Sequence, residues 1–528
     1  MLVWINRLLI VVLALIFVVY LIDTIPASNK TNKLDTFINH INTNYVDSVD
    51  VDSLIESAIY NTLVNLDPHS NYITKSEAEA TMVELDGKFY GIGVEFAIYR
   101  DTITILNVIE NGPSQKQGLK AGDRIVTIED TLVAGVGITN KDIIHSLRGE
   151  RGTAVKVGVI NRQTPIIKQV KIIRDKIPVV SLDLAYEIAP NIGFIKLNRF
   201  SANTYSEFEI ALNQLIEHSN ISGLILDLRG NSGGYLGQAI KLLNEFFDAQ
   251  KLLVYTKGNA RMEQQYISNS FGSFKKGALI ILIDEGSASA SEIVAGAIQD
   301  HDRGLVVGTR SFGKGLVQEQ IAFDDGSLLR MTVSRYYTPS GRCIQKPYGN
   351  NKEEYLTESY LRGSEIDTLL PDTIIQFNTT SGRIVYGGGG ITPDSIISDS
   401  NEKISTELIH LYTSDFLENI VFDYVDINRP YLSSIAPNET IISKAHQIIL
   451  LDNIYKWMHV ESKSKDFLEF KSSQDFTEYE QYIIKRLQIL IVRQQWGWPE
   501  MQKFLNQQDK IISTSLSLFY KQHQFLNK

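Results

Sequence analysis

The sequence predicts an α/β protein with a small, mostly-β domain inserted ahead of its main layer and helical segments at both ends. Between residues 179 and 346, continuous apolar stretches such as ALIILID alternate with amphipathic ones, which is typical of a buried sheet covered by helices. Between residues 82 and 178, TITILNVI and AVKVGVI are β-branched and partly alternating, which predicts short strands. At 528 residues the chain is too long for a single core.

Composition excludes some classes of function. A net charge of -10 and a pI near 5.5 argue against nucleic-acid binding, because a phosphate backbone selects basic surfaces. Cys343 is the only cysteine, which excludes an internal disulfide and a cysteine-based metal cluster. No cysteine stands directly after the apolar N-terminal run, so we expect no lipoprotein anchor.

The N-terminal run LLIVVLALIFVVYLI, residues 8–22, contains no charge. Its length fits the core of a signal peptide, and with the residues before it the run reaches the length of a membrane span. Ile25 stands where a cleavage site after Ala27 would require a small residue. We therefore expect residues 1–30 to anchor the chain in the inner membrane facing the periplasm, or to be cleaved and release it there.

Two helical regions flank the rest of the chain. In residues 31–81 apolar side chains recur at helical spacing until Pro68, in LDPHSNYI, ends the pattern. Residues 401–528 contain long amphipathic stretches, which predict a helical C-terminal domain whose role the sequence leaves open.

Three serines stand at a strand-to-helix junction in DEGSASASEIVAGAIQD: Ser287, Ser289 and Ser291. A serine nucleophile needs a base and an oxyanion site, and a helix start supplies free N–H groups and a positive dipole end. Serine is also a common N-cap residue of helices. The junction alone therefore does not distinguish a catalytic nucleophile from a structural cap.

A candidate base lies in SFGKGLVQEQIAF, where Lys314 stands between two glycines and Gln318 follows four residues later. In a strand this even spacing places both side chains on one face. Burial of that face would lower the pKa of the lysine and make its amine a usable base, whereas exposure would leave an ordinary surface lysine. His69 and His301 show no triad-like partner in the sequence.

Eight segments, in chain order, resemble the carboxyl-terminal processing proteases, the tail-specific serine peptidases of family S41 with an embedded PDZ domain. They are LDPHSNYI, YGIGVEF, GPSQKQGLKAGDRI, LRGERGTAV, LDLRGNSGG, GSASASEI, FGKGLVQ and GGGGITPD. The resemblance covers about residues 32–396. It implies a crotonase-like (ClpP-like) α/β core, residues 179–400, preceded by a PDZ domain, residues 82–178.

The resemblance also assigns the catalytic residues. Ser289 is the nucleophile, Lys314 the base and Gln318 the residue that orients the lysine. The oxyanion donors are the N–H of Ala290 and that of a glycine in NSGG, Gly233 or Gly234. The resemblance implies that such a Ser–Lys dyad cleaves peptide bonds without a metal or an organic cofactor. Together with the N-terminal apolar run, it leads us to expect an exported serine endopeptidase.

The PDZ domain of this family binds a free C-terminus, which adds as a strand beside the G-I-G-V loop. Here that loop is Gly91, Ile92, Gly93 and Val94. Arg148 matches the arginine of the family's L-R-G motif, which in some members helps couple the PDZ domain to the active site. The expected partners are proteins or peptides with free apolar C-termini; an adaptor protein, a homo-oligomer and the sign of the PDZ effect stay open.

Two other functions compete with this interpretation. A non-catalytic PDZ scaffold would be expected to have lost Ser289, Lys314 or Gln318, and all three are present. Acyl-CoA chemistry on the same fold would explain neither the dyad motifs nor the PDZ-like segment. The sequence therefore favours a peptidase, although residues beyond about 400 do not match the common core of the family.

Overall fold

A computed structural model describes residues 33–161, 166–349, 351–361, 375–397, 405–437, 442, 444–464 and 473–519. The predicted anchor, residues 1–30, lies outside these ranges. Within them, no helix combines the length and apolar character that a membrane span requires.

The main layer is a six-stranded sheet in the order β10-β11-β12-β15-β16-β21. Its strands are β10 (Leu182–Ala189), β11 (Ile192–Leu197), β12 (Gly223–Asp227), β15 (Ala278–Ile283), β16 (Leu305–Gly308) and β21 (Ser395–Ile396). All neighbours are parallel except β10 and β11. Every residue of β12 is buried, as the continuous apolar pattern predicted.

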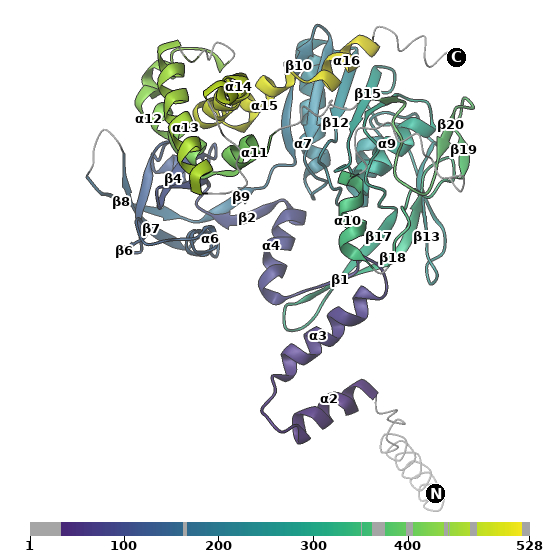
Figure 1. Ribbon diagram of the computed structural model, residues 1–528. Helices are drawn as coiled ribbons and strands as arrows, with labels where there is room; N and C mark the ends of the chain where they lie inside the picture. Colours follow the sequence, from purple (N-terminus) through teal and green to yellow (C-terminus); the bar gives the residue numbers. More distant parts are fainter. Residues whose placement is uncertain are drawn as a thin grey trace, which may run out of the picture.

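Helices cover both faces of this sheet. The helices α7 (Thr204–Ser219), α8 (Leu236–Leu243) and α9 (Ala290–Asp300) contribute to the large core on one face. On the other face, α16 (Lys510–Phe519), at the end of the described chain, packs Ile511 and Ile512 against the strands. Figure 1 shows α16, in yellow, over the main sheet, where the chain arrives from α15.

A second sheet stands beside the main layer and forms one wall of the site described below. It has the order β1-β18-β13-β14, with β17 also paired to β18. Its strands are β1 (Asn71–Ile73), β13 (Leu252–Lys257), β14 (Gln264–Ile267), β17 (Leu316–Ala322) and β18 (Leu328–Tyr337). Beside it are the helix α10 (Lys352–Leu361) and the hairpin of β19 (Gln376–Asn378) and β20 (Ile384–Tyr386). Because β1 belongs to this sheet, the N-terminal segment is not wholly helical.

The N-terminal segment holds three helices, α2 (Lys33–Asn44), α3 (Val51–Val64) and α4 (Lys75–Asp86). Asp50 caps α3 by accepting the N–H groups of Asp52 and Ser53. In Figure 1, α2 and α3 extend away from the body of the molecule.

The inserted β domain is joined to the body by a two-stranded connector, β2 (Lys88–Gly91) paired with β9 (Asp175–Pro178). Its sheet has the order β3-β4-β5-β7-β8, with β6 paired to β5. The elements are β3 (Val94–Tyr99), β4 (Thr102–Val108), α5 (Pro113–Lys116), β5 (Arg124–Ile128), β6 (Thr131–Leu132), α6 (Asn140–Leu147), β7 (Ala154–Ile160) and β8 (Lys168–Ile173). Ile103, Ile105 and Ile125 are fully buried in its separate core.

The C-terminal segment is helical, as its amphipathic pattern predicted, and the helices from α11 to α14 share an apolar core of their own, while α16 packs on the main sheet. The helices before α16 are α11 (Thr406–Thr413), α12 (Asp415–Leu432), α13 (Lys444–Ser464), α14 (Ser473–Trp496) and α15 (Trp498–Asn506). In Figure 1 this domain sits against the inserted β domain, and α15 leads from it toward the main sheet.

Candidate active site

Ser289 is the N-cap of α9, at the point where the chain leaves β15 and turns into the helix. Its backbone has φ 55° and ψ -111°, a left-handed conformation that a residue other than glycine adopts at a cost of about 1–3 kcal/mol. Strain of this kind persists only where surrounding contacts hold it. Those contacts come from Glu292 and from the glycine turn opposite.

The two neighbouring serines have structural partners. The hydroxyl of Ser287 donates to the Leu228 carbonyl at 2.8 Å, and that of Ser291 donates to the Asn231 carbonyl at 2.8 Å. Both side chains are completely buried. They fasten the start of α9 to the turn that follows β12, while Ser289 faces a cleft.

Lys314 and Gln318 contact each other directly. The Lys314 Nζ donates to Gln318 Oε1 at 3.0 Å, and the Gln318 Nε2 donates to the His69 carbonyl at 2.8 Å. Gln318 is therefore held at both ends of its amide. The expectation that Lys314 lies on the strand itself is wrong, because β17 begins at Leu316 and a bulge follows Val317. The lysine lies in the glycine turn before the strand, and this bend brings its side chain to Gln318.

Partial burial in the cleft wall, with the positive charge of Arg330 nearby, lowers the pKa of Lys314 to about 8. A substantial fraction of the amine is therefore neutral near physiological pH. His69 behaves differently: burial, and secondly the charge of Lys314, lower its pKa to about 3, and its ring contacts the Tyr355 hydroxyl. The imidazole is thus neutral, and it is the main-chain carbonyl of His69 that supports the site.

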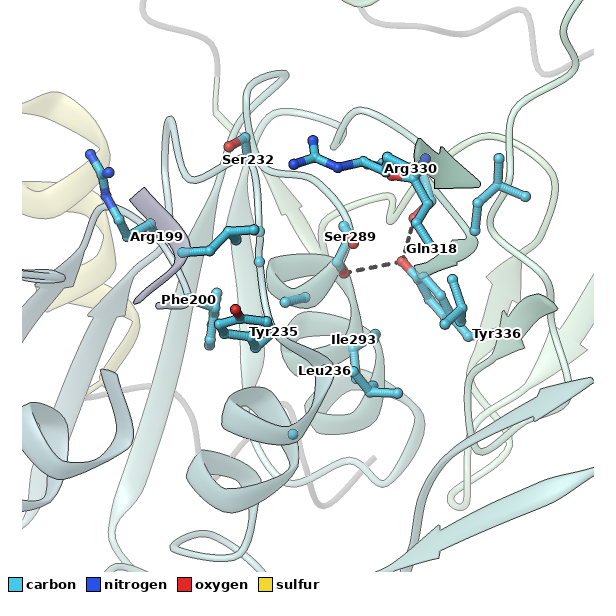
Figure 2. A pocket seen from close by; sticks show the side chains of 18 of the residues that line it. Arg199, Phe200, Ser232, Tyr235, Leu236, Ser289, Ile293, Gln318, Arg330 and Tyr336 are labelled. Atoms are coloured by element: carbon cyan, nitrogen blue, oxygen red, sulfur yellow. Dashed lines mark hydrogen bonds between the residues drawn. The ribbon is translucent and has the colours of Figure 1, made fainter. Parts of the chain in front are cut away.

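All the residues predicted for the catalytic site line one cleft of about 870 Å³. They are Ser289, Lys314, Gln318, Ala290, Gly233 and Gly234. Figure 2 shows Ser289 between Arg330 and Gln318 on one side and the turn carrying Ser232 on the other, with Ile293 and Leu236 below it. The cleft thus combines polar groups around the hydroxyl with an apolar floor.

The glycine turn after β12 is built around Asn231, whose side chain is completely buried. Its Nδ2 donates to the Leu197 carbonyl at 3.0 Å, and its Oδ1 accepts the Gly233 N–H at 2.9 Å. A Cβ on Gly233 would lie 2.6 Å from the Ala288 carbonyl oxygen and 2.9 Å from the Ala290 nitrogen. Only glycine fits where the turn meets the start of α9. The Gly233 N–H is already donated to a side chain.

Glu292 was not identified from the sequence. Its buried carboxylate joins the start of α9, which carries Ser289, to the turn that carries Lys314. Oε2 accepts the N–H groups of Ser289 and Lys314, both at 2.8 Å. Oε1 accepts the Gly313 N–H at 2.7 Å and the Ser311 hydroxyl at 2.6 Å. Burial raises the pKa of Glu292, and the four donors oppose that rise. The spacing Ser289-x-x-Glu292 is that of a capping box, which predicts the bond from the Ser289 N–H to Glu292. It does not predict the three bonds that Glu292 accepts from residues 311–314.

Tyr336 makes a second link between the dyad residues. Its hydroxyl lies 2.7 Å from the Lys314 carbonyl and 3.1 Å from the Ser289 carbonyl, the two dashed lines of Figure 2. The ring is 1% exposed, so the single hydroxyl proton is shared between these two acceptors away from bulk water. Tyr336 and Glu292 together fix the backbone of both dyad residues.

The lowered pKa of Lys314 leads to a prediction about pH. If neutral Lys314 is the base, kcat/KM should rise with pH through an inflection near 8, because the protonated form cannot accept a proton. Arg330→Gln removes a positive charge that lowers this pKa, so the inflection should move to higher pH. The position of the inflection is the readout, since Arg330 also lines the cleft. A profile that is flat from about pH 6 to 10 would contradict a titrating lysine base.

The predicted tail-binding loop belongs to the inserted β domain. Gly91 ends β2, the Ile92 carbonyl accepts the N–H and hydroxyl of Ser114, and Val94 begins β3. Gly93 has φ 76°, which favours glycine. Among the strands that the structure describes, β3 pairs only with β4, so its other edge has no strand partner there.

Arg148 follows α6 and does not reach the cleft. Its guanidinium lies 4.2 Å from the ring centroid of Phe89, on the connector strand β2. The predicted coupling role is thus compatible with a contact at the joint between the β domain and the body, and it stays a prediction.

Comparisons with known proteins define the class of this site. Residues 191–351 match the model of peptidase family S41, and residues 91–171 match a PDZ domain. A carboxy-terminal-processing protease of Bartonella bacilliformis is 35% identical over 336 residues, 61% of this chain and 76% of that protein. The carboxy-terminal processing protease CtpB of Bacillus subtilis is 33% identical over 60% of this chain and 65% of its own length.

A solved structure, the photosystem II D1 C-terminal processing protease, is 27% identical and covers 59% of this chain and 83% of its own, with a TM-score of 0.34. The fold, the cleft and the relatives define a serine endopeptidase with a PDZ domain. The chain belongs to the carboxy-terminal-processing proteases of peptidase family S41.

Proposed function

We propose that this protease cleaves its substrates with a Ser289–Lys314 dyad. The observation that carries the proposal is the placement of both residues in one cleft, with the lysine held by Gln318 and its pKa lowered to about 8. In this state the amine can act as a base at neutral pH, which a surface lysine cannot.

In the first half-reaction, neutral Lys314 takes the proton of the Ser289 hydroxyl as the oxygen attacks the scissile carbonyl carbon. The lysine then gives this proton to the leaving amine, and an acyl-enzyme ester remains. In the second half, Lys314 deprotonates a water molecule that attacks the ester. The proton returns to Ser289, so the enzyme is regenerated without any other reactant.

The oxyanion would be stabilised by backbone N–H groups. Ala290 is the first residue of α9, where N–H groups have no partner within the helix and the dipole is positive. Gly233 already donates to Asn231, so we assign the second donor to Gly234. Of the two alternatives predicted for this donor, we keep Gly234 in the proposal.

We also propose that the core, residues 179–400, is crotonase-like. Its support is the run of parallel strands β11, β12, β15 and β16, with the glycine turn after β12 and the nucleophile after β15. In a parallel sheet the carboxyl ends of the strands meet at one edge. Ligands bind at this edge in α/β proteins.

The PDZ domain, residues 82–178, would recognise substrate tails. A tail added to β3 would place its carboxylate against the N–H groups of the loop formed by Gly91, Ile92, Gly93 and Val94. The expected substrates are exported proteins with free apolar C-termini. We propose that the chain meets them in the periplasm, held there by residues 1–30 or released after their cleavage.

Amidation of the substrate C-terminus tests the tail proposal. A charge-assisted hydrogen bond contributes about 1.5–3 kcal/mol, so amidation should weaken binding by about ten- to a hundredfold. A terminal Asp in place of Ala or Val should cost a similar factor. Binding is measured with the full chain carrying Ser289→Ala, and kcat/KM with wild type. Equal affinities and equal kcat/KM values for free, amidated and acidic tails would mean that the PDZ domain does not recognise the substrate C-terminus.

A further inference from the structure

We infer that the C-terminal helical domain is a brace that joins the PDZ domain to the glycine turn of the active site. The inference rests on the proposed function for that turn and for tail binding. The brace is the segment from α11 to α15 with Asp509 at the start of α16. Its two ends contact two different parts of the protein.

The first end is an interface between α12 and the sheet of the PDZ domain. Phe422 stacks on Tyr99 of β3, with ring centroids 4.6 Å apart and an angle of 18°. The guanidinium of Arg124 lies 5.1 Å from the Phe422 centroid and donates to Asp426 at 2.8 Å. The side chains of this ion pair are 20% and 8% exposed, so the pair is largely shielded from water.

This interface is formed on the strand that would receive the substrate tail. Tyr99 belongs to β3, and Arg100 directly after it pairs with Asp423 of α12. Burial by the helices, with Glu418 nearby, raises the pKa of Tyr99 to about 12. A tail paired to β3 would therefore bind a strand whose outer face already carries the C-terminal domain.

The second end reaches the glycine turn. Asp509 Oδ2 accepts an N–H of Arg229 at 2.7 Å, while its Oδ1 caps α16 by accepting the N–H groups of Ile511 and Ile512. Arg229 also makes a two-pronged pair with Asp227 at the end of β12, at 2.9 and 2.8 Å. Arg229 is the residue two before Asn231, which shapes the turn at the nucleophile.

The charges at this end stay ionised and held in place. Burial alone would raise the pKa of Asp227, but Arg229 and Lys196 lower it to about 2. Arg229 is thus clamped between a carboxylate of the core and a carboxylate of the C-terminal segment. A second contact, Asn506 Nδ2 to the Tyr186 hydroxyl at 3.2 Å, fixes the end of α15 on β10.

A packed body connects the two ends. Val421 and Val425 of α12 share a buried core with Leu487 and Ile491 of α14, and α14 continues into α15 after Gly497. The brace therefore sets how β3 lies relative to the glycine turn. A tail bound at β3 can affect catalysis only if the placement of β3 relative to the glycine turn is kept. Substitutions that remove the contact at one end or at the other should therefore change different kinetic constants.

The test compares Asp509→Asn and Asp426→Asn in the full chain. One substrate is a peptide with a free apolar tail, and the other is the same peptide amidated. Asparagine at 509 keeps an oxygen for the helix cap and loses the charge toward Arg229. We expect it to lower kcat about three- to thirtyfold on both substrates with KM unchanged, and Asp509→Glu to recover part of the loss.

Asp426→Asn should leave the amidated substrate unaffected and reduce the advantage of the free tail by about three- to thirtyfold. The matched control is Asp452→Asn, which removes an exposed pair with Lys456 on α13 of the same domain and should change neither substrate. If both test variants behave like this control, the brace is wrong. If wild type shows no Ser289-dependent cleavage or ignores the tail, the proposed function fails, and the inference with it.

Discussion

Replacing either Ser289 or Lys314 with alanine is expected to lower kcat by about 10⁴-fold or more, with the protein still folded. Each residue supplies a step that the other cannot: the serine forms the acyl bond, and the lysine moves the proton at every stage. Because the two act as a unit, the double variant should be hardly slower than either single one. Steady-state cleavage of a tail-bearing peptide measures both effects.

Two further variants are controls for the identity of the nucleophile and of the base. Ser232→Ala removes another hydroxyl from the same cleft and should keep kcat within about threefold of wild type, within the small effect expected of a surface substitution. Lys314→Arg keeps a positive charge but cannot be deprotonated at these pH values, so it should not restore activity. Substantial cleavage by Ser289→Ala would contradict the assignment.

Glu292→Gln is expected to lower kcat by about a hundredfold and to destabilise the fold by at least about 1–3 kcal/mol. An amide can accept through one oxygen only, and its NH₂ group would face N–H donors that are buried with it. The Ser289 and Lys314 backbones would lose the acceptor that they share. Chemical denaturation and kcat are measured on the same preparations.

Glu245→Gln is the matched control for this change. Glu245 is another buried carboxylate, bonded to Tyr205 and Ser273 away from the cleft. Its loss should reduce stability while kcat stays near that of wild type. If Glu292→Gln behaves in the same way, the carboxylate supports the fold and does not position the dyad.

Local patterns in the sequence predicted much of this structure. The alternation of apolar and amphipathic stretches predicted the main layer, and the serines before EIVAGAIQD predicted a strand-to-helix junction, which the structure has at Ser289. These features depend on residues that lie in the same helix or strand or in neighbouring ones. There, hydrophobic periodicity and helix-capping preferences predict the structure. The resemblance to a known family supplied the choice among the three serines.

Contacts between distant residues could not be predicted in this way. The support of Gln318 by the His69 carbonyl joins residues 249 positions apart, and it uses a main-chain atom that every residue type carries. Lys314 lies before the start of β17, and a bulge follows between Val317 and Gln318; spacing reveals neither feature. The contact of Asp509 with Arg229 joins a domain outside the matched family region to the glycine turn, so neither motif nor period indicates it.

The most direct test of the dyad is covalent labelling with a fluorophosphonate, followed by intact mass and peptide mapping. The account predicts one adduct per chain on Ser289, formed faster as pH rises through about 8 and lost in Ser289→Ala. Lys314→Ala should retain the serine but label at least about a hundredfold more slowly, since general-base help contributes about 10²- to 10⁴-fold. An adduct on another serine, or labelling of Ser289 at an unchanged rate without Lys314, would contradict the account.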